Sequence, residues 1–132
     1  MKNTILVSIT AQQSGLELIK TAQQERGSQI FIATVLPKHQ PAAERAQALI
    51  TLNGISQQSG YNIMILYSDF PADTMAMYAR SINAGRVITG LPGQGSRSFK
   101  NNLALLLPEI PVTTCAGNFV ATIPAFSLLN QL

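Results

Sequence analysis

The fold is decided by the stretch Ile5-Leu6-Val7-Ser8-Ile9 and by the helix start Ser14-Gly15-Leu16-Glu17 that follows it. The first stretch is an almost continuous apolar run, which is typical of a strand that is covered on both faces. Ser14 and Glu17 have the spacing of a capping box, so we expect Ser14 to cap the helix and Glu17 to reach back to it. A buried strand that leads directly into a helix is the repeating unit of α/β folds.

The same alternation of strand and helix continues along the chain. Further strands are predicted at residues 30–35, 63–66, 86–89 and 110–115, with a helix before each of them. This order predicts an α/β fold with a parallel sheet and helices on both faces, because parallel strands need crossover connections. We assign residues 1–116 to this one domain.

Two of the predicted helices carry specific expectations. The second begins at Pro41 and ends at Gly60, because proline suits a first helical turn and glycine suits a helix end. The third opens at Asp69 and Pro71, with Asp69 and Asp73 explained as caps. The residues of the second helix that are expected to face inward are Ala42, Ala46, Leu49 and Leu52.

Charge is scarce and unevenly placed. Charged residues make up 11% of the chain, against roughly 25% in a typical soluble domain. None lies between Arg45 and Asp69, and none follows Glu109. Soluble monomers usually keep charge over the whole surface, so we expect part of this surface to be covered by a partner. Residues 117–132 form an apolar-rich tail, predicted to be an interface or an extra strand.

Several classes of protein are excluded by composition. The net charge of +3 comes from dispersed side chains without a basic cluster, which argues against nucleic-acid binding. The single cysteine, Cys115, allows no intramolecular disulfide. No signal peptide is recognisable, and no stretch approaches the ~20 apolar residues of a membrane span. We expect a cytoplasmic protein without membrane insertion.

The most informative candidate site is the glycine-rich loop Gly90–Ser98, which follows the fourth predicted strand. Ligands of open parallel sheets bind at the carboxyl ends of the strands. Backbone N–H groups at a helix start, together with Arg97, favour an anion such as phosphate. A turn that needs glycine for left-handed dihedral angles would have the same composition. The candidate nucleotide-binding residues are Thr10, Ala11, Ser14, Val35, Gly90, Gly93, Gly95, Ser96, Arg97 and Ser98.

The sequence offers no catalytic constellation. His39 is the only histidine, so it lacks a partner for a metal pair or a proton relay. Cys115 ends an apolar strand, which favours a buried structural thiol over a nucleophile. We therefore expect neither a metal nor enzymatic activity; a small hydrolase or phosphotransfer domain is the weakest alternative.

Local motifs resemble the universal stress protein family, in the version embedded in potassium-responsive sensor histidine kinases of the KdpD type. The similarity extends in order over residues 3–115. The segments that carry it are Ile5–Thr10, Ser14 with Leu18–Ala22, Asp69–Ala72 with Tyr78–Arg80, Arg86–Gly90 and Pro108–Val112.

The resemblance implies a Rossmann-like five-stranded parallel sheet in the order 3-2-1-4-5 and adenine-nucleotide binding (ATP or AMP, or cyclic di-AMP). It also implies a homodimer, here through residues 110–132, and a kinase or transporter as partner. ATP-binding members carry Gly-x-x-Gly, nine residues, then Gly-Ser/Thr. Gly90 and Gly93 match the first half of that motif, whereas the second half falls on Leu103-Ala104.

Two hypotheses follow. The first is a regulatory domain that binds an adenine nucleotide and acts as a dimer in stress or potassium-related signalling. The second is a structural or interaction module that binds no small molecule and works through its dimer surface and its tail at residues 117–132.

Overall fold

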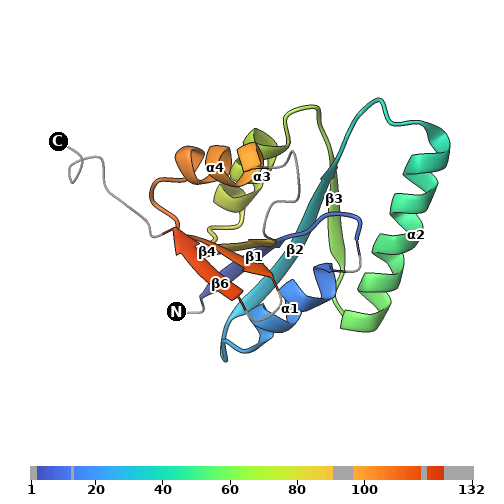
Figure 1. Ribbon diagram of the computed structural model, residues 1–132. Coiled ribbons are helices and arrows are strands. Elements are labelled where there is room, and N and C mark those ends of the chain that lie inside the picture. The colour runs from blue at the N-terminus through green and yellow to red at the C-terminus, as the bar shows by residue number, and fades with distance from the viewer. Residues whose placement is uncertain (1–2, 13, 91–96, 117–118, 124–132) are drawn as a thin grey trace.

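The computed structural model describes residues 3–12, 14–90, 97–116 and 119–123. Strands and helices alternate along the chain, as predicted (Figure 1). The elements are β1 (Thr4–Ser8), α1 (Gly15–Gln23), β2 (Gln29–Leu36), α2 (Ala42–Ser59), β3 (Ile63–Tyr67), α3 (Pro71–Ser81), β4 (Arg86–Gly90), α4 (Arg97–Leu106), β5 (Val112–Ala116) and β6 (Phe119–Ile123).

The strands form one sheet in the order β3-β2-β1-β4-β5-β6. The pairings among β1 to β5 are all parallel, which confirms the predicted five-stranded parallel sheet in the order 3-2-1-4-5. β6 adds a sixth strand, antiparallel to β5. This strand comes from the apolar-rich tail, so part of residues 117–132 pairs with the sheet of its own chain.

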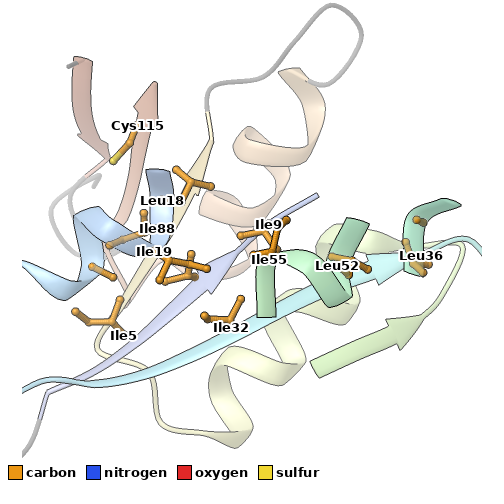
Figure 2. Close-up of a cluster of buried hydrophobic side chains, with 13 residues drawn as sticks. Ile5, Ile9, Leu18, Ile19, Ile32, Leu36, Leu52, Ile55, Ile88 and Cys115 are labelled. Carbon is orange, nitrogen blue, oxygen red and sulfur yellow. The ribbon is translucent and has the colours of Figure 1, made fainter. Parts of the chain in front are cut away.

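Helices cover both faces of the sheet because its central strand is apolar on both sides. In β1, Ile5 and Val7 pack into a cluster with buried residues of α1 and α2 (Figure 2). Leu6 points to the other face, where it packs with buried residues of α3 and α4. The alternation of side chains along a strand therefore explains why the run Ile5–Ile9 is almost continuously apolar.

Two predicted helix caps are not formed as expected: Ser14 is the N-cap residue of α1 but its side chain caps nothing, and Asp69 is not the N-cap residue of α3. Ser14 already has helical dihedral angles, φ −58° and ψ −17°, and its side chain makes no capping hydrogen bond. A capping side chain normally extends from a residue in the β region, which places its oxygen over the free N–H groups of the first turn. Asp69 does not cap α3 either: Phe70 precedes that helix, and Asp69 Oδ1 accepts a hydrogen bond of 3.3 Å from the Lys38 N–H.

The inward face of α2 was predicted only in part. Leu52 is buried as expected, but Ala42, Ala46 and Leu49 are exposed. The other buried residues of the helix are Ala48 and Ile55. α2 carries apolar residues around most of its circumference, so its sequence does not by itself define which face packs on the sheet. The predicted end of the helix is confirmed at Gly60, which has a left-handed φ of +79°.

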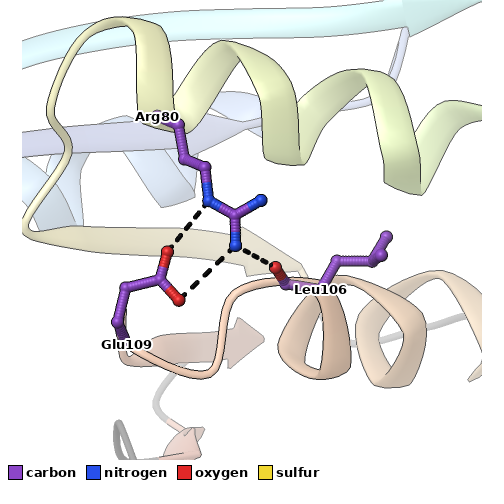
Figure 3. Close-up of polar contacts among 3 residues, drawn as sticks. All are labelled: Arg80, Leu106 and Glu109. Atoms are coloured by element: carbon purple, nitrogen blue, oxygen red, sulfur yellow. Dashed lines mark hydrogen bonds and ion pairs between the residues drawn. The ribbon is translucent and has the colours of Figure 1, made fainter.

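The C-terminal end of α4 is held by a polar cluster (Figure 3). Arg80, near the end of α3, donates Nη2–H to the carbonyl oxygen of Leu106 at 2.6 Å. Its Nε–H donates to the Glu109 carboxylate at 3.0 Å. These contacts fix the end of α4 that lies away from the loop after β4. Within the described part of the chain, no helix has the length and apolar character to cross a membrane.

Candidate functional site

The candidate site lies where the strand order reverses. From β1 the chain proceeds outward through β2 to β3, and then crosses the sheet to β4 on the other side of β1. The connections after β1 and after β4 therefore leave the sheet in opposite directions. In open α/β sheets this arrangement leaves a crevice at the carboxyl ends of the two central strands, and ligands bind there.

The strand register brings several predicted site residues to this edge. Ser8 is level with Ala33 of β2 on one side and with Thr89 of β4 on the other. Thr10 and Val35 each follow by two residues, and Gly90 by one, so all three lie at the same carboxyl edge. Thr10 is exposed, whereas Val35 is half-buried against the cluster beneath α3 and α4.

The starts of two helices lie at the same edge, because α1 follows β1 and α4 follows β4. The first turn of a helix presents free N–H groups and the positive end of the helix dipole. The first turn of α1 contains Glu17, whereas that of α4 contains no acidic residue. Arg97 and Lys100 are both residues of the first turn of α4. Of the two helix starts, that of α4 is therefore the more favourable one for an anion.

The remaining predicted residues divide into two groups. Ser14 is exposed just before α1, and Ala11 is half-buried against the cluster beneath α1 and α2. Gly93, Gly95 and Ser96 lie outside the described residues. For Arg97 and Ser98 the structure gives the backbone as the first turn of α4.

A row of buried hydroxyl groups crosses the sheet just below the site, and the sequence reasoning did not include it. Ser8, Thr89 and Thr114 are level with one another on β1, β4 and β5. All three are buried, and they follow Leu6, Val87 and Val112 by two residues on the face beneath α3 and α4. Hydroxyl groups both donate and accept hydrogen bonds. In the sequence, this row is visible only as a Ser or Thr near the carboxyl end of three of the apolar strand runs.

Two glycines lie where α1 packs on the sheet near the site. A methyl group built on Gly15 would lie 3.4 Å from side-chain atoms of Ile9 and Ile55, and one on Gly90 would lie 3.7 Å from Leu18 Cδ1. Gly15 therefore has close neighbours both directly after β1 and on α2. At Gly90 the space is ordinary van der Waals contact, so the fold itself does not require glycine there.

Beyond the site, polar contacts link the segments that follow β2 and β3. Arg45 donates Nη2–H to the carbonyl oxygen of Lys38 at 2.8 Å, and its guanidinium lies 5.3 Å from the centre of the Tyr67 ring. Asp69 accepts from the Lys38 N–H. Buried Gln40 Oε1 and Arg45 Nε have no hydrogen-bond partner in the described part of the chain. His39 is exposed in this segment.

Cys115 is the buried thiol expected from the sequence. Burial raises its pKa above the ordinary value, and the nearby Arg86 and a hydrogen bond with Thr21 oppose that shift. A thiol that stays protonated is a poor nucleophile. Arg86 itself pairs with Glu25 and donates to Thr113 Oγ1 at 3.0 Å. Among the described residues, no group of three or more His, Cys, Asp or Glu side chains is placed to hold a metal ion.

Comparison with known proteins identifies the fold through structure and not through sequence. No protein-family model matches the chain, and no curated protein matches it at a significant level. A universal stress protein in complex with cAMP superposes with a TM-score of 0.65 at 15% identity, covering 86% of this chain and 96% of its own.

A second structural neighbour is the universal stress protein from Archaeoglobus fulgidus in complex with dAMP. Its TM-score is 0.58 at 16% identity, and the match covers 80% of this chain and 90% of that one. The fold described above is therefore the fold of these universal stress proteins.

Proposed function

We propose that this chain is a universal-stress-type regulatory domain that binds an adenine nucleotide at the carboxyl edge of β1, β2 and β4. One observation carries the proposal: Thr10, Val35 and Gly90 meet at the strand-order reversal, beside a helix start that holds cations and no acid. The fold is shared with two proteins solved with cAMP and with dAMP, which supports an adenine nucleotide as the ligand class.

In this proposal the phosphate lies over the backbone at Gly90 and at the first turn of α4, where Arg97 compensates its charge. The base lies against the end of β2, near Val35. The hydroxyl row that includes Ser8 and Thr89 forms the polar floor beneath them. The chain binds and senses the nucleotide and does not transform it.

The finer assignment rests on the sequence motifs. We place the chain with the version of the family that is embedded in KdpD-type sensor kinases, in the cytoplasm, with a role in potassium-related or stress signalling. Nucleotide binding biases a homodimer formed through residues 110–132, or the interface with a kinase or transporter.

Calorimetric titration of nucleotide-free protein with ATP, AMP and cyclic di-AMP tests the ligand. We expect heat with at least one of the three, and Arg97→Gln should weaken that binding about tenfold, or ~1.4 kcal/mol. Arg26→Gln is the matched control, because Arg26 is an exposed cation in the turn after α1. An absence of heat with every ligand would contradict the proposal, and equal weakening by both variants would remove the role of Arg97.

A second candidate function is favoured by one structural observation. Leu103 and Ala104 occupy the place of the Gly-Ser/Thr pair of ATP-binding members, and both are buried in the cluster beneath α3 and α4. This supports an interaction module that binds no small molecule. Its test is the molar mass from light scattering after deletion of residues 117–132. This candidate requires a change of oligomeric state, and an unchanged mass contradicts it.

A further inference from the structure

The proposed nucleotide site assigns only one contact to the base. That contact is Val35, a small aliphatic side chain that is half-buried at the end of β2. Ligand pockets usually enclose most of the ligand surface, and apolar and aromatic side chains form most of their lining. A flat base that rests on Val35 with one face needs a second apolar surface for its other face.

Phe70 is the candidate for that second surface. Its side chain is 69% exposed, although phenylalanine is among the residue types that are most often buried. In the described parts of the connections that follow β1, β2, β3 and β4, it is the only phenylalanine, tyrosine or tryptophan. The apolar side chains with a similar exposure lie within helices; they are Ile50, Met77 and Leu105.

Phe70 belongs to the same face of the sheet as Val35. It directly precedes Pro71, the first residue of α3, and α3 packs in one cluster with Ala33 of β2. Ala33 and Val35 are two residues apart on β2, so their side chains point to the same face. Because α3 follows β3 and runs back over the sheet to β4, its start lies at the carboxyl edge. Phe70 therefore lies at the edge, and on the face, to which we assign the base.

Three hydrogen bonds hold the backbone around Phe70 against the end of β2. The Ser68 N–H donates to the carbonyl oxygen of Leu36 at 2.9 Å, and the Lys38 N–H donates to Asp69 Oδ1 at 3.3 Å. The Phe70 N–H donates to Ser68 Oγ at 3.0 Å, which fixes the turn that leads into α3. A ring on a backbone that is already ordered loses less conformational entropy when a ligand binds.

We propose that the Phe70 ring stacks on the base of the bound nucleotide, so that the base lies between Phe70 and Val35. The inference rests on the adenine-nucleotide site proposed above and adds a residue that binds its ligand. Stacking on an aromatic ring is open to every base, because each base has a π-face. Phe70 therefore contributes affinity, whereas hydrogen-bonding groups of the site select the base.

Calorimetric titration with ATP, AMP and cyclic di-AMP tests the role of the ring. Phe70→Ala should weaken the binding of the nucleotide that the wild type binds about tenfold. Phe70→Leu should weaken it as well, because leucine keeps an apolar side chain but has no ring, whereas Phe70→Tyr should bind as the wild type does. Met77→Ala is the matched control, since Met77 is an apolar residue of α3 with 72% exposure; its affinity should be unchanged.

Fluorescence locates the base without a loss of affinity. The chain contains no tryptophan, so Phe70→Trp introduces a single indole at the proposed stacking position. Nucleotide should quench the fluorescence of this variant, because the base would lie on the indole. Met77→Trp is the control and should not respond. Fluorescence that is unchanged in Phe70→Trp, or quenched equally in both variants, contradicts stacking at this position.

The two proposals fail in different ways in these measurements. A wild type that binds none of the three nucleotides overturns the proposed function and the stacking together. A wild type that binds a nucleotide, with Phe70→Ala binding it equally well, overturns the stacking alone and leaves the nucleotide site in place.

Discussion

The guanidinium of Arg80 and the carboxylate of Glu109 form an ion pair with an Nε to Oε1 distance of 3.0 Å, although both side chains are 52% exposed. Through its second contact, to the Leu106 carbonyl, the same guanidinium links the C-terminal ends of α3 and α4. The hydrogen bond from Arg80 is the main reason that the pKa of Glu109 is lowered. This pair adds a polar link at the end of α4 opposite to the helix start that we assign to the phosphate.

Glu109→Gln should destabilise the fold slightly, by about 0.2–1 kcal/mol at neutral pH, because an exposed pair contributes little. A lowered pKa in the folded state stabilises the fold above the carboxyl's unfolded pKa and is lost as the pH falls through the folded one. The difference between wild type and variant should therefore shrink as the pH falls below the ordinary pKa of a glutamate carboxyl. Urea unfolding at neutral and at acidic pH measures it; a difference that is as large in acid as at neutral pH contradicts the ion pair.

Two glycines of the α2 region should respond in opposite directions to alanine. Gly54 lies within α2 with open space around it, so Gly54→Ala should stabilise the fold by about 0.5–1 kcal/mol. Gly60 has φ +79°, so Gly60→Ala should destabilise it by about 1 kcal/mol. Thermal unfolding of the two variants is the measurement, and shifts of the same sign would show that one of these helix positions is misplaced.

Gly90→Ala should separate ligand binding from folding. A methyl group there would make only ordinary contact, 3.7 Å from Leu18 Cδ1, so the melting temperature should stay close to that of the wild type. If the phosphate lies over the Gly90 backbone, the same methyl group should weaken nucleotide binding about tenfold, or ~1.4 kcal/mol. Calorimetry of the folded variant is the test, and unchanged affinity would move the phosphate away from β4.

Cys115 should resist alkylation in the folded protein. Its burial raises the pKa of the thiol and also blocks access, so iodoacetamide at about pH 8 should leave it unmodified. In denaturant the same residue should react fully, which provides the internal control. Intact-mass spectrometry measures both states. Native labelling at the denatured rate would show that the β5 end of the core is open.

The parallel sheet could be predicted because apolar strand runs alternate with helical runs along the chain, and its order 3-2-1-4-5 followed from the family resemblance. Helix faces and caps could not be read so directly. Leu49 and Ala48 are both apolar neighbours on α2, and only the position of the helix on the sheet decides that Ala48 is buried. Ser14 has the residue type, spacing and position of an N-cap, but its dihedral angles are already helical and its side chain makes no capping hydrogen bond.

The sequence predicted which strand ends and loops border the candidate site. It did not predict the buried hydroxyl groups beneath the site. Thr10, Val35 and Gly90 follow from the rule that ligands bind at carboxyl strand ends. The hydroxyl row of Ser8, Thr89 and Thr114 depends on the register between strands that are far apart in sequence. Three separate polar residues in apolar runs have no visible relationship until that register is known.

The central position of β1 has a consequence for the order in which the protein can fold. β1 pairs with β2 early in the chain, but its other neighbour is β4, whose Arg86 is level with Ile5. During synthesis, β1 therefore keeps one edge open until β4 has left the ribosome. Contacts between residues so distant in sequence slow folding. One edge of β1 is thus closed early, by β2, and the other only when β4 has been made.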